Sequence, residues 1–146
     1  MYIFDGAMGT MLQAAGLEES YCPELFNIER PEVVKDIHAQ YLQHGSDVIT
    51  TNTFGACGLK LEDYDLQDRV REINIAAVKV AKEAIAENKP TARVAGSMGP
   101  TGRFLQPLGN MSFDSIYDTY REQAEALIEG GVDFIIIETI IDVQEM

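Results

Sequence analysis

Short, β-rich apolar segments alternate along the chain with longer segments in which apolar residues recur every three or four positions. The β-rich segments cover residues 2–4, 47–51, 92–95 and 133–137, and the last one ends in four apolar residues in succession. A strand that is apolar at every position is typical of a parallel sheet that is covered on both faces. The pattern therefore predicts an α/β fold with four parallel strands and right-handed crossovers.

Helices are predicted between these strands from their apolar stripes and end signals. The first begins at Pro31, a residue suited to a first helical turn, and ends before Gly45. The second is expected to begin with Asp65 or Asp68 as N-cap, and the third has Ser112 in that position. The final residues, 142–146, are interpreted as the first turn of a fourth helix.

Two architectures fit this order, an open doubly wound sheet and part of a (β/α)8 barrel. The segment DGAMGT after the first strand only partly matches a dinucleotide-binding turn, and Asn52 follows the second strand where that fold places an acid for the ribose. An open-sheet nucleotide binder is thus the weaker hypothesis. A full barrel takes about 250 residues. Residues 1–146, which show no domain boundary, would then be the first half of a barrel domain, with strands one to four.

The charge balance narrows the possible partners. The chain has 146 residues with 24 acidic and 11 basic side chains, giving a net charge of −13. So acidic a chain is not expected to bind nucleic acid or an anionic membrane surface. There is no transmembrane-length apolar stretch and no signal-peptide pattern at the N-terminus, and the two cysteines make no disulfide framework, so a cytoplasmic protein is expected.

The candidate chemistry lies where the predicted strands end. Asp5 and Glu138 each follow an apolar strand directly and should therefore meet at one rim of the sheet. Asp5 precedes a glycine and is also explained as a turn former. Glu138 is harder to explain structurally, because a carboxylate beside a buried strand needs a cation or donors. Two such acids suit a ligand ammonium, or acid–base work if their pKa values differ.

The histidines and cysteines are weaker candidates for functional residues. The histidines, His38 and His44, are expected at the surface or in packing. Cys22 and Cys57 have no zinc-type spacing, so no metal ligand and no catalytic residue is predicted within the chain.

The rim segments resemble the homocysteine S-methyltransferase family. The opening FDGAMGTMLQ and the stretch ELFNIERPEVVKDIHAQYLQHGSDVITTNTFGA carry the resemblance, and VAGSMGPTGR, PLG and EGGVDFIIIETIID continue it in order. The GPTG and PLG elements look most like the homocysteine-binding module of the cobalamin-dependent methionine synthases, a branch of this family. Betaine- and S-methylmethionine-dependent members share the DG, TNTF-like and E-T/E-x elements less closely and remain an alternative.

The resemblance implies a (β/α)8 barrel that binds homocysteine and transfers a methyl group to it to form methionine. In that family a zinc ion held by three cysteines binds the substrate sulfur. In the cobalamin-dependent branch the methyl group comes from methylcobalamin or methyltetrahydrofolate. Carried over residue by residue, Asp5 and Glu138 match the acids that hold the substrate ammonium, and Gly6 and Ala7 match backbone that contacts it. Asn52 matches a polar residue near the substrate.

The departures from the family pattern define what this chain is expected to lack. The Asn-Cys and Gly-Gly-Cys-Cys elements that supply the zinc ligands are absent, and Cys22 and Cys57 do not match them. Modules for cobalamin and folate are absent as well. The chain alone is therefore expected to be inactive, with the remaining barrel half and a corrinoid module as partners. Alternatively, the half-barrel is an assembly unit that forms homo-oligomers through its open strand edges.

Overall fold

The computed structural model describes residues 1–145 and has a parallel, three-stranded sheet at its centre. The strands are β1 (Val48–Thr50), β2 (Arg93–Met98) and β3 (Phe134–Ile137), and they lie side by side in that order. The register places Val48 opposite Arg93, and Ala95 opposite Phe134. The predicted α/β class with parallel strands is confirmed.

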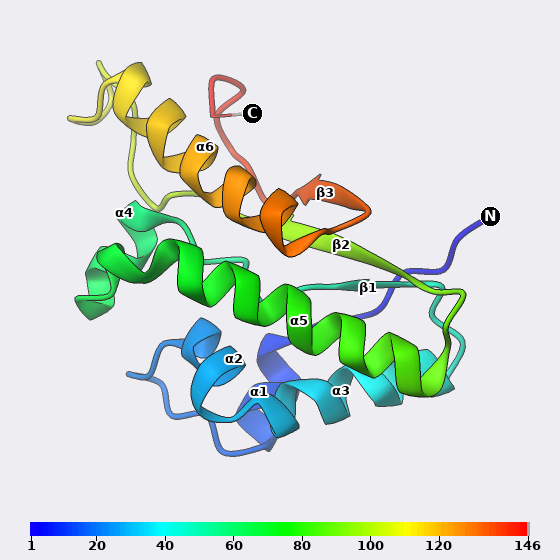
Figure 1. Cartoon of the computed structure of the whole chain (residues 1–146). Coiled ribbons are helices and arrows are strands. Elements are labelled where there is room, and N and C mark those ends of the chain that lie inside the picture. The colour runs from blue at the N-terminus through cyan, green and yellow to red at the C-terminus, as the bar shows by residue number, and fades with distance from the viewer. Residues whose placement is uncertain (146) are drawn as a thin grey trace.

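Helices pack along one face of this sheet (Figure 1). Within the described residues, the helical segments are α1 (Gly9–Ala14), η1 (Pro23–Leu25), α2 (Phe26–Glu29), α3 (Pro31–Gln43), α4 (Gly58–Leu61), η2 (Glu62–Tyr64), η3 (Gln67–Arg69), α5 (Val70–Asn88) and α6 (Phe113–Gly130). The longest, α5, lies between α3 and α6 (Figure 1). None of these helices is long and apolar enough to cross a membrane.

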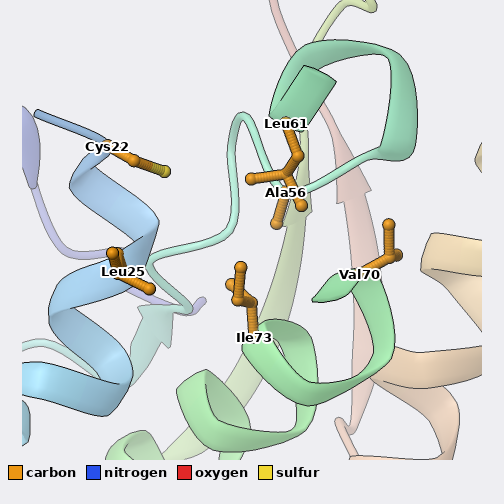
Figure 2. Packing of buried hydrophobic residues seen from close by; sticks show 6 residues of the cluster. All are labelled: Cys22, Leu25, Ala56, Leu61, Val70 and Ile73. Atoms are coloured by element: carbon orange, nitrogen blue, oxygen red, sulfur yellow. The ribbon is translucent and has the colours of Figure 1, made fainter. Parts of the chain in front are cut away.

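Close packing joins the helices to the strands and the loops. Gly96 of β2 leaves room for Leu127 of α6, because a Cβ at Gly96 would lie only 3.0 Å from Leu127 Cδ1. A hydrophobic cluster joins η1, the loop after β1, α4 and the start of α5 (Figure 2). Its buried members are Cys22, Leu25, Ala56, Leu61, Val70 and Ile73. The loop that follows β1 is therefore held by a hydrophobic core of its own.

The first predicted strand, residues 2–4, forms only one isolated parallel bridge, from Phe4 to Val48. Side chains explain why the ladder stops there. Thr50 N donates to Asp5 Oδ2 over 2.8 Å, and Ile3 N donates to Asp47 Oδ2 over 3.0 Å. Both amides thus bond to side-chain carboxylates and not to backbone carbonyls, so the pairing does not extend. The prediction of four strands is corrected to three strands within residues 1–145, with residues 2–4 joined to the sheet by a single bridge.

The helix ends follow the predicted signals in two cases of three. Pro31 opens α3, and the Ser112 hydroxyl accepts the Ser115 N–H at the start of α6. The start of α5 was predicted wrongly, because Asp65 takes a left-handed conformation (φ 58°) that ends η2 and Asp68 lies within η3, so that Arg69 is the N-cap. Residues 143–145 form a turn, and the predicted fourth helix there does not form by Glu145; Met146 lies outside the described residues.

Candidate functional site

The C-terminal ends of the strands border a cavity of about 480 Å³. All five predicted site residues line it, namely Asp5, Gly6, Ala7, Asn52 and Glu138. They come from three segments that are up to 133 positions apart in the sequence (138 − 5), and the parallel strands bring them together. The structure therefore gathers the predicted residues at one rim.

Asp5 is held in place by the neighbouring strand. Its Oδ2 accepts the Thr50 N–H over 2.8 Å, and its Oδ1 accepts the Thr50 hydroxyl over 3.1 Å. Burial raises the pKa of Asp5 to about 6, although the bonds from Thr50 oppose the rise and the charge of Glu138 adds to it. The carboxylate is thus oriented by two donors and is poised to gain from a cation.

Glu138 follows β3 and is oriented from β2 in the same way. The Ser97 hydroxyl donates to Glu138 Oε1. The backbone of Glu138 is fixed as well, because its N–H donates to Met98 O over 3.1 Å. Across the rim the order is therefore Asp5, Thr50, Ser97 and Glu138, with one carboxylate at each end and a hydroxyl-bearing residue beside each.

Ser97 itself belongs to a buried network of threonines. Thr53 Oγ1 donates to Ser97 O over 2.7 Å, and Ser97 N donates to Thr51 Oγ1 over 3.1 Å. Gln123 of α6 adds a donor to Thr53 O at 2.8 Å. The group that orients Glu138 is therefore fixed by the loop after β1 and by α6.

The turn after the first strand places its backbone next to Tyr41. A Cβ on Gly6 would lie 3.0 Å from the Tyr41 hydroxyl oxygen, so a residue without a side chain suits this position. The same hydroxyl donates to Ala7 O over 2.9 Å. This contact fixes the turn against α3 while Gly6 and Ala7 line the cavity.

Asn52 lies on the cavity wall with its side-chain amide engaged. Its Nδ2 donates to Pro23 O over 2.8 Å, and its backbone O accepts Asn27 Nδ2 over 2.7 Å. It is only 5% exposed. The side-chain amide of Asn52 therefore joins the cavity wall to η1.

Sequence analysis missed several residues that line the cavity, among them Glu24, Thr50, Phe54 and Ser97. Thr50 and Ser97 lie at strand ends, so the rule that ligands bind there could have found them. Glu24 comes from η1, outside any strand, and no sequence pattern pointed to it.

Zinc does not fit the residues that the structure describes. In residues 1–145 no three histidine, cysteine, aspartate or glutamate side chains cluster in a way that could hold a metal ion. Burial raises the pKa of Cys22 to about 12 and that of Cys57 to about 11, which favours the protonated thiols over the thiolates that zinc needs.

The fold and the rim define an α/β protein with an acid-bearing cavity at the C-terminal ends of its parallel strands. Two carboxylates, each oriented by a hydroxyl from the next strand, suit a small ligand with a cationic group. Residues 2–146 match the homocysteine S-methyltransferase family, and the chain belongs to this family.

The chain is similar to two mycobacterial methionine synthases. It is 40% identical to methionine synthase of Mycobacterium tuberculosis and 37% identical to that of Mycobacterium leprae, over 97% of its own length in both cases. It spans only 13% and 12% of the length of these two relatives.

Solved structures agree with the fold. The homocysteine methyltransferase MmuM from Escherichia coli matches in its oxidized form with a TM-score of 0.83 at 26% identity, over 99% of this chain and 55% of that one. The metallated form matches equally well, at 27% identity and over 56% of its chain. The chain therefore corresponds to about half of MmuM.

Proposed function

We propose that this chain forms the amino-acid-binding half of a homocysteine methyltransferase. The observation that carries the proposal is the pair of oriented carboxylates, Asp5 and Glu138, on one cavity. Family membership supports homocysteine as the substrate. A homocysteine ammonium bound between the two acids would receive two charge-assisted hydrogen bonds.

Each residue of the rim then has a stated part. Thr50 and Ser97 keep the two carboxylates in their binding geometry before the ligand arrives. The ammonium would lower the pKa of Asp5 from about 6 and so hold this group ionised. Gly6 and Ala7 would bring backbone close to the amino acid, and Asn52 would border it.

We further propose that residues 1–146 are the first half of a (β/α)8 barrel. MmuM, of which the chain covers 55%, and the methionine synthase relatives support this proposal. The zinc ligands would then lie outside this chain, as would the cobalamin and methyltetrahydrofolate modules, and the chain alone would not turn over. The GPTG and PLG elements favour the cobalamin branch over a betaine- or S-methylmethionine-type donor.

The substitution Glu138→Gln in the complete barrel tests the binding role. It should weaken homocysteine binding by about 1.5–3 kcal/mol, or roughly 10- to 150-fold, measured by isothermal titration calorimetry. Glu125→Gln, which neutralises an exposed acid on α6, is the matched control. An unchanged affinity in Glu138→Gln would remove this residue from the site.

A second candidate role, assembly, is favoured by an apolar groove between α6 and β3. Its volume is about 470 Å³, and Phe113, Tyr117 and Ile137 on its walls are 56%, 55% and 48% exposed. We propose that the remaining barrel half covers this groove in the complete protein. A second copy of this chain is the alternative occupant. Light scattering of the chain tests the alternative of a homo-oligomer, because a monomer at high micromolar concentration would exclude self-association through this face.

A further inference from the structure

We infer that Glu24 is a positioning residue for the homocysteine site, because it fixes the loop after β1 that forms one wall of the cavity. This inference rests on the proposed function. The wall consists of Thr51, Asn52 and Phe54, and Glu24 lines the same cavity although it comes from η1.

Three hydrogen bonds fasten the loop to the segment formed by η1 and α2. Gly55 N donates to Glu24 Oε1 over 2.7 Å. Asn52 Nδ2 donates to Pro23 O over 2.8 Å, and Asn27 Nδ2 donates to Asn52 O over 2.7 Å. Glu24 and Asn27 are only 5% and 2% exposed, so water does not readily replace these bonds.

Both oxygens of the Glu24 carboxylate accept hydrogen bonds from within the protein, which favours positioning over direct ligand binding. While Oε1 accepts the Gly55 amide, Oε2 accepts the Cys22 thiol over 3.3 Å. Glu24 thus differs from Asp5 and Glu138, whose hydrogen bonds come from the rim itself. Its oxygens serve the scaffold beneath the wall.

Gly55 is matched to this carboxylate. A Cβ at Gly55 would lie 2.8 Å from Glu24 Oε1 and 3.4 Å from Glu24 Cδ. An alanine at this position would therefore push the carboxylate away while leaving every atom of Glu24 in the chain. The two residues offer independent ways to loosen the same contact.

The consequence for the site lies in Asn52 and Phe54. The loop carries both side chains to the cavity, and Phe54 O accepts the Gly99 N–H over 3.0 Å on its far side. If the bond between Glu24 and Gly55 is lost, the loop keeps its bonds at Asn52, but its Phe54–Gly55 end is no longer joined to η1. The cavity wall then moves, and the bound amino acid loses contacts without any change in Asp5 or Glu138.

Amide hydrogen exchange on the chain tests the structural part. Glu24→Ala should speed exchange at Gly55 and Ala56 by about tenfold or more, because the amide of Gly55 loses its acceptor. Glu24→Gln keeps an oxygen acceptor and should retain the protection. The amides of α5 should not change in either variant. Unchanged exchange at Gly55 in Glu24→Ala would overturn the inference.

Homocysteine titration of the complete barrel tests the functional part. Glu24→Ala and Gly55→Ala should each weaken binding by roughly tenfold, whereas Glu24→Gln and the exposed control Glu19→Ala should stay within about twofold. A loosened loop with unchanged binding would overturn the positioning role. Should Glu24→Ala fail to fold, Gly55→Ala decides the question.

The titration also separates this inference from the proposed function. If the unmodified barrel did not bind homocysteine, the proposed function would fail and the positioning role in that site with it. If the unmodified barrel binds homocysteine and the Glu24 and Gly55 variants bind it equally well, the proposed function stands and the inference alone fails.

Discussion

The Ser97 hydroxyl donates a hydrogen bond to Glu138 Oε1 and so joins the C-terminal ends of β2 and β3. The same arrangement recurs at the end of β1, where the Thr50 hydroxyl donates to Asp5 Oδ1. Each carboxylate of the candidate site is therefore oriented by a hydroxyl from the adjacent strand. Preorganisation of this kind lowers the cost of ordering the site when a ligand binds.

Removal of the Ser97 hydroxyl should cost substrate affinity. Ser97→Ala leaves Glu138 without this donor, and homocysteine binding to the complete barrel should weaken by about 1.5 kcal/mol, or roughly tenfold, in calorimetric titrations. Ser115→Ala, which removes an exposed hydroxyl from α6, should have no effect. Equal affinities for Ser97→Ala and the unmodified protein would mean that Glu138 needs no orientation from β2.

Homocysteine binding should depend on pH through Asp5. The pKa of this group is about 6 in the free protein because burial disfavours its charged form, and only the ionised form attracts an ammonium. Affinity should therefore be constant above pH 7 and fall by up to about tenfold per pH unit below 6. Asp5→Asn should bind weakly at every pH, with this slope removed. A slope that persists in Asp5→Asn would assign it to another group.

The same carboxyl should make the chain less stable at neutral pH than in weak acid. Its folded pKa of about 6 lies above the ordinary value of 3.8, so the folded state binds more protons between these two values. The stabilisation is present below pH 3.8 and is lost as the pH rises through 6. Asp5→Asn should accordingly raise the melting temperature at pH 7.5 and have little effect at pH 4.

His38 should act in the opposite direction. It is fully buried in α3, neither ring nitrogen has a hydrogen-bond partner, and burial lowers its pKa from 6.5 to about 4. The unfolded state then binds the proton first, so stability falls as the pH drops from 6.5 towards 4, by at most about 1.4 kcal/mol per pH unit.

The variant His38→Leu should remove this acid sensitivity. Urea unfolding at pH 7.5 and pH 5 should show a larger gain for His38→Leu at the lower pH. The exposed Gln43 at the end of the same helix does not titrate and is the control, and Gln43→Leu should leave the pH profile unchanged. An equal gain for His38→Leu at both pH values would show that protonation of His38 does not contribute.

Gly99 should tolerate no side chain. The Cβ of an alanine there would lie 2.6 Å from Phe54 Cε2 and 2.7 Å from Phe54 O. Gly99→Ala should destabilise the chain by about 1–3 kcal/mol in urea unfolding, because the ring and the backbone must both move. Gly9→Ala, where a Cβ meets nothing within 4 Å, should change stability by less than about 0.5 kcal/mol. Similar values for the two variants would contradict the packing seen at Phe54.

The sequence predicted the parts of this molecule that depend on neighbours along the chain. The continuous apolar run 134–137 indicated a parallel strand, and Ser112 indicated the start of α6. The predicted burial of that strand was wrong for this chain, because Phe134 and Ile137 are 37% and 48% exposed. Asp5 and Glu138 could be paired because both follow strands, and parallel strands bring their C-terminal ends together.

Hydrogen bonds between residues that lie far apart in the sequence could not be predicted in this way. Nothing local shows that the carboxylates of Asp5 and Asp47 replace backbone acceptors and limit the first strand to one bridge. Glu24 reaches the cavity from η1 through a contact with Gly55, 31 residues further on. The burial of His38 likewise follows from tertiary packing around α3.

The central claim, that Asp5 and Glu138 jointly bind an amino-acid ammonium, is tested most directly by removing the ammonium from the ligand. Homocysteine and its deamino analogue, 4-mercaptobutyrate, would be titrated into the complete barrel and into its Asp5→Asn and Glu138→Gln variants. We predict that each variant weakens homocysteine binding by roughly 10- to 150-fold and leaves the analogue unaffected or bound more tightly. Equal losses for both ligands would contradict the account.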